Sequence, residues 1–266
     1  MKNVLKTFGI IALAAVIVFS TVACGKKSGG GSSSGGGKAA SASDFSYDLT
    51  ADGKGILIKR YTGKSTKIVV PTKIEDLPVT EIGEDALNGK TFTIDVSSGK
   101  AEGKTKANER SAITSITIPN TVTTIGRDAF ANTAITKFNM PDSVTKLDDG
   151  AFYGCEQLTE LRLSDNITQL RTVGGSALSG NLKSLKKVNL PAKLESICDD
   201  AFSSCGELSE LIIPENIKSV KFLVHSTYDN FVKPSESYHW RMFIGCSKLP
   251  IKTRQIIKGW GYEGEF

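Results

Sequence analysis

Few side chains in this sequence are spaced for chemistry. Residue types that bind metal ions gather in one segment, as His225, Asp229, Glu236 and His239, but their spacing matches no zinc pattern. Cys246 and His239 form a nucleophile and base pair in residue type alone, because no third group is placed to orient the base. We therefore predict no catalytic residue, no cofactor and no bound metal.

The cysteines of the C-terminal half indicate packing. Three of them close an F-x-x-C pattern, at Cys155, Cys205 and Cys246, and no C-x-x-C or Cys/His spacing indicates zinc. A thiol at such a repeated position is among the most buried side chains. We expect buried thiols, with one alternative left open, because Cys205 and Cys246 follow each other in the repeat and could meet disulfide geometry.

The first residues are typical of an export signal. Lys2 and Lys6 precede an apolar run that starts at Phe8. From Phe8 to Ala23 there are 16 residues, fewer than the roughly 20 that a membrane-spanning helix needs. We therefore predict a signal peptide at 1–23, with an uncleaved anchor as the alternative.

The tripeptide Thr21-Val-Ala23, followed by Cys24, resembles a bacterial lipobox. This resemblance implies that Cys24 is acylated and becomes the mature N-terminus. More than one acyl chain would anchor the protein stably to a membrane. Plain cleavage after Ala23, without lipidation, is the alternative.

Residues 24–44 combine this cysteine with a tether rich in Gly and Ser, a composition that cannot bury a core. Twenty such residues span about 25 Å on average. A membrane-held anchor with a free-standing head fits this arrangement.

The charge is concentrated near the predicted anchor. The chain has 33 basic and 28 acidic residues. Because five lysines and one aspartate precede residue 45, residues 45–266 hold 28 basic and 27 acidic side chains. A nearly neutral head lacks the concentrated basic face of a nucleic-acid-binding protein, so we predict no nucleic-acid partner.

One line of sequence recurs along the head. Ile113–Asn132, Ile135–Gly154 and Leu185–Ser204 align position by position. Equivalent positions are separated by steps of 22, 23, 27 and 23 residues, from Pro119 through Pro141, Ser164 and Pro191 to Pro214. With a further copy upstream at Ile68–Leu87, there are six copies. Such a period predicts a solenoid, which usually offers a binding surface.

The third copy, Ile135–Cys155, shows how each copy folds. Phe138 and Met140 alternate with Lys137 and Asn139, which predicts a short strand with one buried face. A proline then ends the strand, because it cannot donate to a continuing ladder. Copies stacked about 4.8 Å apart would pair these strands in parallel around one core. We assign the recurring ring position to that core, at Leu87, Phe130, Phe152, Leu178, Phe202 and Phe243.

Both ends of the solenoid need caps. Phe45–Leu49 and Ile56–Tyr61 flank a turn rich in Gly and Asp, which predicts a β-hairpin. Pro250 to Lys258 predicts a short helix, after which aromatic residues fold back over the last turn. The predicted domains are 1–23, 24–44, an N-terminal cap at 45–67, repeats at 68–248 and a C-terminal cap at 249–266.

This pattern resembles the BspA-like leucine-rich repeats of the treponemal type. The residues that carry the resemblance are Ile116, Ile118-Pro119, Val122, Ile125-Gly126, Ala151-Phe152, Cys155 and Leu158/Leu161. The resemblance covers about residues 45–266. It implies a right-handed solenoid with a parallel β-sheet on one face and short helical or irregular segments opposite. It also implies a surface lipoprotein or adhesin without catalytic residues or cofactor.

The sequence departs from the pattern in three places. The fourth copy has Ser164 for proline and Leu178 for phenylalanine. Insertions at 90–111 and 221–241 interrupt the repeats, and insertions of this kind emerge as loops, often on a binding face. We interpret the centre of the first insertion as a surface loop, with a strand possible at Phe92–Val96.

Two surfaces are candidates for a partner. The first is the strand face, where polar residues between the apolar ribs form ladders, at Ser115, Thr117, Lys137, Asn139, Glu160, Arg162, Lys187, Asn189, Glu210 and Ile212. The second is the 221–241 insertion, whose rings include Tyr228, Phe231, Tyr238 and Trp240. The alternatives are a solvated face and rings that pack onto the solenoid.

We therefore predict a bacterial lipid-anchored envelope protein that binds proteins, as in adhesion to host matrix or aggregation with other bacterial cells. The expected location is the outer membrane or cell surface. A periplasmic scaffold that never reaches the surface is the first alternative. An enzyme that uses the 221–241 insertion is a minor one.

Overall fold

The structure, a computed structural model, describes residues 38–89, 91–94, 103–106, 113–170, 182–198, 201–223 and 242–266. The chain divides into two compact units, Met1–Gly36 and Gly37–Phe266, and every described residue lies in the second. The second unit holds the whole described core, from Phe45 to Tyr262. It therefore contains what a domain needs to fold on its own.

The N-terminal end of this unit is an antiparallel hairpin. β1 (Phe45–Leu49) and β2 (Ile56–Tyr61) pair with the predicted bounds. β2 also pairs in parallel with β5 (Leu77–Ile82), which joins the hairpin to the solenoid. β4 (Lys73–Ile74) runs antiparallel to β5.

The fold begins before Asp44, inside the segment predicted as tether. Ser41 caps a 3-10 turn, η1 (Ala42–Asp44), and the N–H of Ala40 donates to the carbonyl of Val69 at 2.9 Å. The side chains of Ala40 and Ala42 pack against the core. Small residues can lie this close to a strand edge, which composition alone did not indicate.

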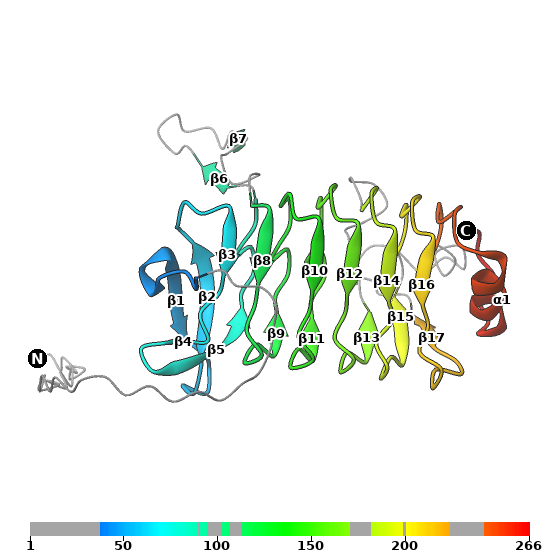
Figure 1. Cartoon of the computed structure of the whole chain (residues 1–266), viewed down its shortest axis with the longest axis horizontal. Coiled ribbons are helices and arrows are strands. Elements are labelled where there is room, and N and C mark those ends of the chain that lie inside the picture. The colour runs from blue at the N-terminus through cyan, green and yellow to red at the C-terminus, as the bar shows by residue number, and fades with distance from the viewer. Residues whose placement is uncertain are drawn as a thin grey trace, which may run out of the picture. The chain divides into compact units, whose positions relative to one another are not determined.

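Each of the six predicted copies contributes one front strand in the described part of the chain. These strands are β3 (Lys67–Val69), β8 (Ser115–Thr117), β10 (Lys137–Asn139), β12 (Glu160–Arg162), β14 (Lys187–Asn189) and β16 (Glu210–Ile212). β10, β12, β14 and β16 form one parallel sheet, and β3 pairs in parallel with β8. Figure 1 shows them side by side, so the predicted parallel solenoid is confirmed.

A second ladder of short strands forms the back of the solenoid, where the sequence led us to expect helical or irregular segments. β5 continues into β9 (Thr124–Ile125) and β11 (Lys146–Leu147). β13 (Gln169–Leu170), β15 (Ser196–Cys198) and β17 (Lys221–Leu223) form a separate sheet. The V-x-x-I segment of a copy is thus an extended strand opposite the front strand. Its Ile or Leu side chain is buried in the core.

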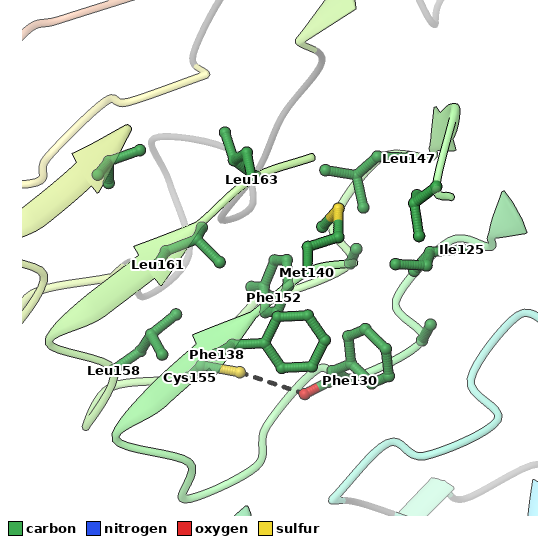
Figure 2. Packing of buried hydrophobic residues seen from close by; sticks show 14 of the residues in the cluster. Ile125, Phe130, Phe138, Met140, Leu147, Phe152, Cys155, Leu158, Leu161 and Leu163 are labelled. Atoms are coloured by element: carbon green, nitrogen blue, oxygen red, sulfur yellow. Dashed lines mark hydrogen bonds between the residues drawn. The ribbon is translucent and has the colours of Figure 1, made fainter. Parts of the chain in front are cut away.

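The core lies inside the turns and is built on the recurring rings. Figure 2 shows Phe130, Phe138 and Phe152 packed together, with ring centroids 5.0–5.4 Å apart. Further along, Phe202 and Phe243 stack at 5.4 Å. All of these rings are buried, so the described part of the aromatic stripe is core, as predicted.

The repeated cysteines are buried thiols, as predicted. Cys155 donates to the carbonyl of Phe130 at 3.2 Å, the dashed line in Figure 2, and Cys246 donates to that of Phe202 at 3.1 Å. No disulfide joins Cys205 and Cys246. The thiols of Cys155 and Cys246 therefore each connect one copy to the copy before it.

The fourth copy replaces the missing proline with a hydrogen bond. Ser164 is fully buried, its Oγ donates to the carbonyl of Val144 at 2.5 Å, and it accepts from the N–H of Asn166 at 3.1 Å. Because a buried hydroxyl costs free energy unless it is bonded, the two bonds explain how serine is accepted here.

The C-terminal end is closed by α1 (Ile251–Gly259), one residue later than the predicted helix. Pro250 is its N-cap, and Ile257 is its buried residue. Tyr262 is buried beyond it, with its ring 5.4 Å from that of Phe243. This packing closes the last turn of the core.

The two insertions are described only in part. In the first, β6 (Thr91–Ile94) and β7 (Gly103–Lys106) pair as an antiparallel hairpin. In the second, β17 is described, and residues 224–241 lie outside the described residues.

Candidate binding surface on the front face

The outward side of β8, β10, β12, β14 and β16, called the front face below, brings the predicted strand residues together. Its members are Ser115, Thr117, Lys137, Asn139, Glu160, Arg162, Lys187, Asn189, Glu210 and Ile212, all exposed or half-buried. Side chains alternate along a strand, so the middle residue of each front strand points into the core and the residues on either side of it point outward. The parallel register then aligns them as two rows across the strands.

The first row is a ladder of alternating charge. Lys137 pairs with Glu160 at 2.6 Å, and Lys187 pairs with Glu210 at 2.6 Å. The register also places Glu160 opposite Lys187. These exposed pairs contribute little to stability, and they leave the row without a dominant sign.

The second row has Arg162 at its centre. Its Nη2 donates to both carboxylate oxygens of Asp142 at 3.0 Å, and its Nη1 donates to the carbonyl of Met140 at 2.8 Å. The hydrogen bond from Arg162 is the main reason that the pKa of Asp142 lies below its usual range. Asp165 lies 3.6 Å from the same guanidinium. Arg162 thus braces its own copy against the preceding one.

Asn189 also has a structural role. Its Oδ1 accepts from the N–H of Leu163 at 3.0 Å, and its Nδ2 donates to the carbonyl of Leu163 at 3.2 Å. By contrast, no side-chain hydrogen bond to a described residue involves Asn139 or Thr117, and both are exposed. The second row therefore offers unoccupied hydrogen-bonding groups at β8 and β10.

A shallow groove of about 590 Å³ runs over this face from β8 to β16. Three cations line it, and each lies within ion-pair distance of a carboxylate. Ile212 is the apolar exception at the β16 end, with 42% of its surface exposed. A groove that is balanced in charge and rich in amides and hydroxyls suits a polar protein surface better than a polyanion.

The predicted residues of the strand face therefore lie together, while other predicted sites cannot be placed. Tyr228, Phe231, Tyr238, Trp240 and the lipidation site Cys24 lie outside the described residues. Sequence reasoning missed the rim carboxylates Asp142 and Asp165. The sequence could have indicated these two carboxylates. Both occupy the first turn position after a front strand, where a side chain can reach the neighbouring copy.

Groups that could perform chemistry are scarce in the described part of the chain. It contains no cluster of three or more His, Cys, Asp or Glu residues suited to a metal. Burial raises the pKa of Cys155 to about 11 and that of Cys246 to about 12, and it raises the pKa of Cys205 as well. A thiol that stays protonated in a dry core is not a nucleophile.

The described residues also include no helix long and apolar enough to cross a membrane.

The chain is similar to known leucine-rich repeat proteins. Residues 103–231 match the profile of the BspA type leucine rich repeat region in six copies. The structure of a T. pallidum leucine rich repeat protein superimposes with a TM-score of 0.59 and 25% identity, over 86% of this chain and 99% of that one. A leucine-rich repeat protein from Bacteroides ovatus gives a TM-score of 0.38 and 20% identity, over 66% and 54%. No curated protein sequence is significantly similar.

Proposed function

Because the chain carries BspA-type leucine-rich repeats, we propose that it is an exported, lipid-anchored bacterial protein that binds other proteins through its front face. The observation that carries this proposal is the pair of polar rows over the groove. Solenoids commonly bind partners on such extended surfaces.

The chemistry of the face fits a protein partner. Thr117 and Asn139 offer hydrogen-bonding groups, Ile212 offers an apolar contact, and the charged row is already neutralised. Protein interfaces combine an apolar contact with a polar rim in the same way. Adhesion to host matrix proteins or to other bacterial cells is the role we propose, without a catalytic step.

The first test is location. Intact cells are treated with a protease, and the folded unit is detected by blotting, with a periplasmic protein as the control. We expect the unit to be lost while the control survives. Protection of the unit until the envelope is opened would reject adhesion and favour the periplasmic scaffold.

The second test blocks the face. Thr117→Arg with Asn139→Arg adds bulk and charge to two exposed positions, and neither change removes a side-chain hydrogen bond to a described residue. We expect adhesion to immobilised matrix proteins, or aggregation of displaying cells, to fall by about tenfold or more. Melting temperature should stay unchanged.

A matched pair elsewhere controls for the added charge. Thr168→Arg and Gln255→Arg change a threonine and a side-chain amide at exposed positions before β13 and on α1, and neither change removes a side-chain hydrogen bond to a described residue. Adhesion should be retained in this variant. An equal loss in both variants, or no loss in the front-face variant, would contradict the assignment of binding to the front face.

A further inference from the structure

The back ladder of the solenoid is interrupted at one place. β9 pairs with β11 and β13 pairs with β15, whereas β11 and β13 do not pair, although they belong to the third and fourth copies and follow each other in the stack. Figure 1 shows β13 set further from β11 than from β15. On the front the same two copies are joined, because β10 pairs with β12. We call this interruption the seam, with residues 145–148 on one side and residues 168–170 on the other.

Each strand beside the seam has one bonded backbone edge and one open edge. On its bonded edge, β11 donates from the N–H groups of Lys146 and Asp148 to the preceding copy, at 3.2 and 2.9 Å. On the bonded edge of β13, the carbonyl of Thr168 accepts from the N–H of Ser196 at 3.2 Å. Among the described residues, no backbone hydrogen bond crosses the seam. Two open strand edges therefore face each other there, and an open edge is a template for a further strand.

A cavity of about 400 Å³ opens at the seam. Residues from both strands line it: Thr145, Lys146, Leu147, Asp148, Thr168 and Gln169. Its volume lies within the range of pockets that hold small ligands, about 300–1,000 Å³. Because its lining includes the exposed Thr168 and the buried Leu147, the cavity reaches from solvent to the edge of the core. The seam thus has room for a short segment of chain.

The turn before β13 holds the two copies together beside the seam. The Oγ of Ser164 donates to the carbonyl of Val144 at 2.5 Å, and the Nδ2 of Asn166 donates to the carbonyl of Asp142 at 2.6 Å. The fourth copy is therefore bonded to the third as far as Asn166, and the back strands separate beyond it. Because the front strands are paired as well, the seam is a slot within one fold.

The lining of the slot indicates the chemistry of its occupant. Lys146 and Asp148 pair at 3.1 Å, so the slot carries no net charge that would select an anion or a cation. The side-chain amide of Gln169 already donates to the thiol of Cys198 at 3.2 Å. The open backbone edges remain, and an extended polypeptide presents donors and acceptors with the same spacing of about 3.3 Å per residue.

The neighbouring back strands show which side chains fit such a slot. β9, β11 and β13 each consist of a polar residue followed by an aliphatic one, and the aliphatic residues, Ile125, Leu147 and Leu170, are buried. An occupant with the same order places its polar side chain outward and its aliphatic side chain beside Leu147. Proline does not suit the paired positions, because it has no N–H.

We propose that the seam binds an extended peptide segment of a partner protein, inserted as a strand between β11 and β13. Its backbone bonds to the N–H of Thr168 and to the carbonyl of Thr145, and one aliphatic side chain contacts Leu147. Strand addition derives affinity from main-chain hydrogen bonds and specificity from alternate side chains. The seam shares no lining residue with the groove on the front face, so this site is separate from the one proposed for adhesion.

Hydrogen exchange of the unit Gly37–Phe266 tests this proposal, with a synthetic peptide that has the sequence of residues 120–127 and so includes β9. We expect saturating peptide to slow exchange of the Thr168 amide by at least about tenfold and to leave that of Glu195 unchanged. The same peptide, N-methylated at the residues equivalent to Thr124 and Ile125, keeps its side chains and loses two donors. It should not protect Thr168.

Two variants at one position separate the backbone from the side chain. Thr168→Pro removes an N–H that bonds to no described backbone group, and it keeps the carbonyl that accepts from Glu195. We expect the affinity for the peptide to fall by at least about tenfold. Thr168→Ala keeps the N–H and should bind the peptide as the unaltered unit does. Melting temperatures of the two variants, measured without peptide, check that both are folded.

Four results would overturn the proposal. Equal binding of the N-methylated peptide would show that backbone pairing is not the basis of binding. Protection of β1 or β16 in place of Thr168 would show that the peptide adds to an end of a sheet. Protection of Thr168 without peptide would assign the seam to the chain itself in a monomer, or to a second copy if the protection rises with protein concentration.

The seam and the front face can be tested independently. The front-face variant, Thr117→Arg with Asn139→Arg, should bind the peptide as the unaltered unit does. Failure of the peptide experiment would leave the adhesion assay and its front-face variant unaffected. Conversely, a failed adhesion assay would leave the measured peptide binding unchanged.

Discussion

At Asp128 the repeat places a carboxyl where its charge is disfavoured. Asp128 and Asp85 occupy equivalent positions in consecutive copies, with φ of 51° and 54°. Burial, followed by the charge of Asp85, raises the pKa of Asp128 to about 6. In the next copy this position is Gly150, where an added Cβ would lie 2.3 Å from Asp128 Oδ1. Because Gly150 has no Cβ, the carboxyl group of Asp128 can occupy this space.

Replacing Asp128 with asparagine should stabilise the protein near neutral pH. The folded pKa is above the unfolded value, so the folded state binds the proton more tightly, and stability falls as pH rises from about 4 to about 6. Asparagine keeps the shape and accepts positive φ, but carries no charge. We expect Asp128→Asn to raise the free energy of unfolding by about 1 kcal/mol at pH 7, after allowance for its partial exposure.

Denaturant unfolding at two pH values checks this prediction. The gain should be present at about pH 7 and nearly absent at about pH 3, where the carboxyl is largely protonated in both states. Asp85→Asn offers a comparison at the same position of the preceding copy. A gain from Asp128→Asn that is equal at both pH values would show that ionisation is not its cause.

Among the elements, the back ladder lacks one pairing that the front ladder has, between β11 and β13. On the back, Thr145 donates its N–H to Thr123 at 2.9 Å, and Glu195 donates its N–H to Thr168 at 2.7 Å. The corresponding bond from Thr168 to Thr145 is absent between these described residues, and β11 does not pair with β13. On the front of the same step, Thr159 still bonds to Thr136 at 2.8 Å. Among the described residues, backbone strand pairing therefore joins these two copies on the front and not on the back.

Hydrogen exchange should detect this seam. We expect the amide of Thr168 to exchange much faster than those of Thr145 and Glu195, because exchange follows the loss of backbone hydrogen bonds. The amide of Thr159, on the front of the step, should remain protected. Equal protection of Thr168 and its two counterparts would mean that the back ladder is continuous in solution.

The strands also show what sequence could and could not predict. The alternation around Phe138 and Met140 predicted the front strands and their outward residues, because a buried face leaves a clear period. From β9 to β17, the back strands are two or three residues long, too short to show a period of two. Hydrogen bonds between copies, such as those of Arg162, depend on register, which emerges only when the copies are stacked.

For the whole molecule, stability depends on contacts between adjacent copies. Each copy packs only on its neighbours, so the end copies depend on their caps. Tyr262 is central to the C-terminal cap: its ring lies 5.5 Å from that of Phe222 and 5.3 Å from that of Phe266. Its hydroxyl accepts from the N–H of Phe243 at 3.3 Å and donates to the carbonyl of Glu265 at 3.0 Å.

Tyr262→Ala should therefore unfold the solenoid from its C-terminal end. Removal of a buried ring lowers the free energy of unfolding by about 3–5 kcal/mol. The copy that packs against the ring should be destabilised first, because each copy contacts only its neighbours. Hydrogen exchange should show β16 and β17 losing protection while β9 and β11 keep theirs. Tyr262→Phe removes only the hydroxyl and should cost about 1 kcal/mol. If Tyr262→Ala lowered protection equally from β9 to β17, the unit would unfold as one cooperative block, and the front face could not stay folded when its cap is lost.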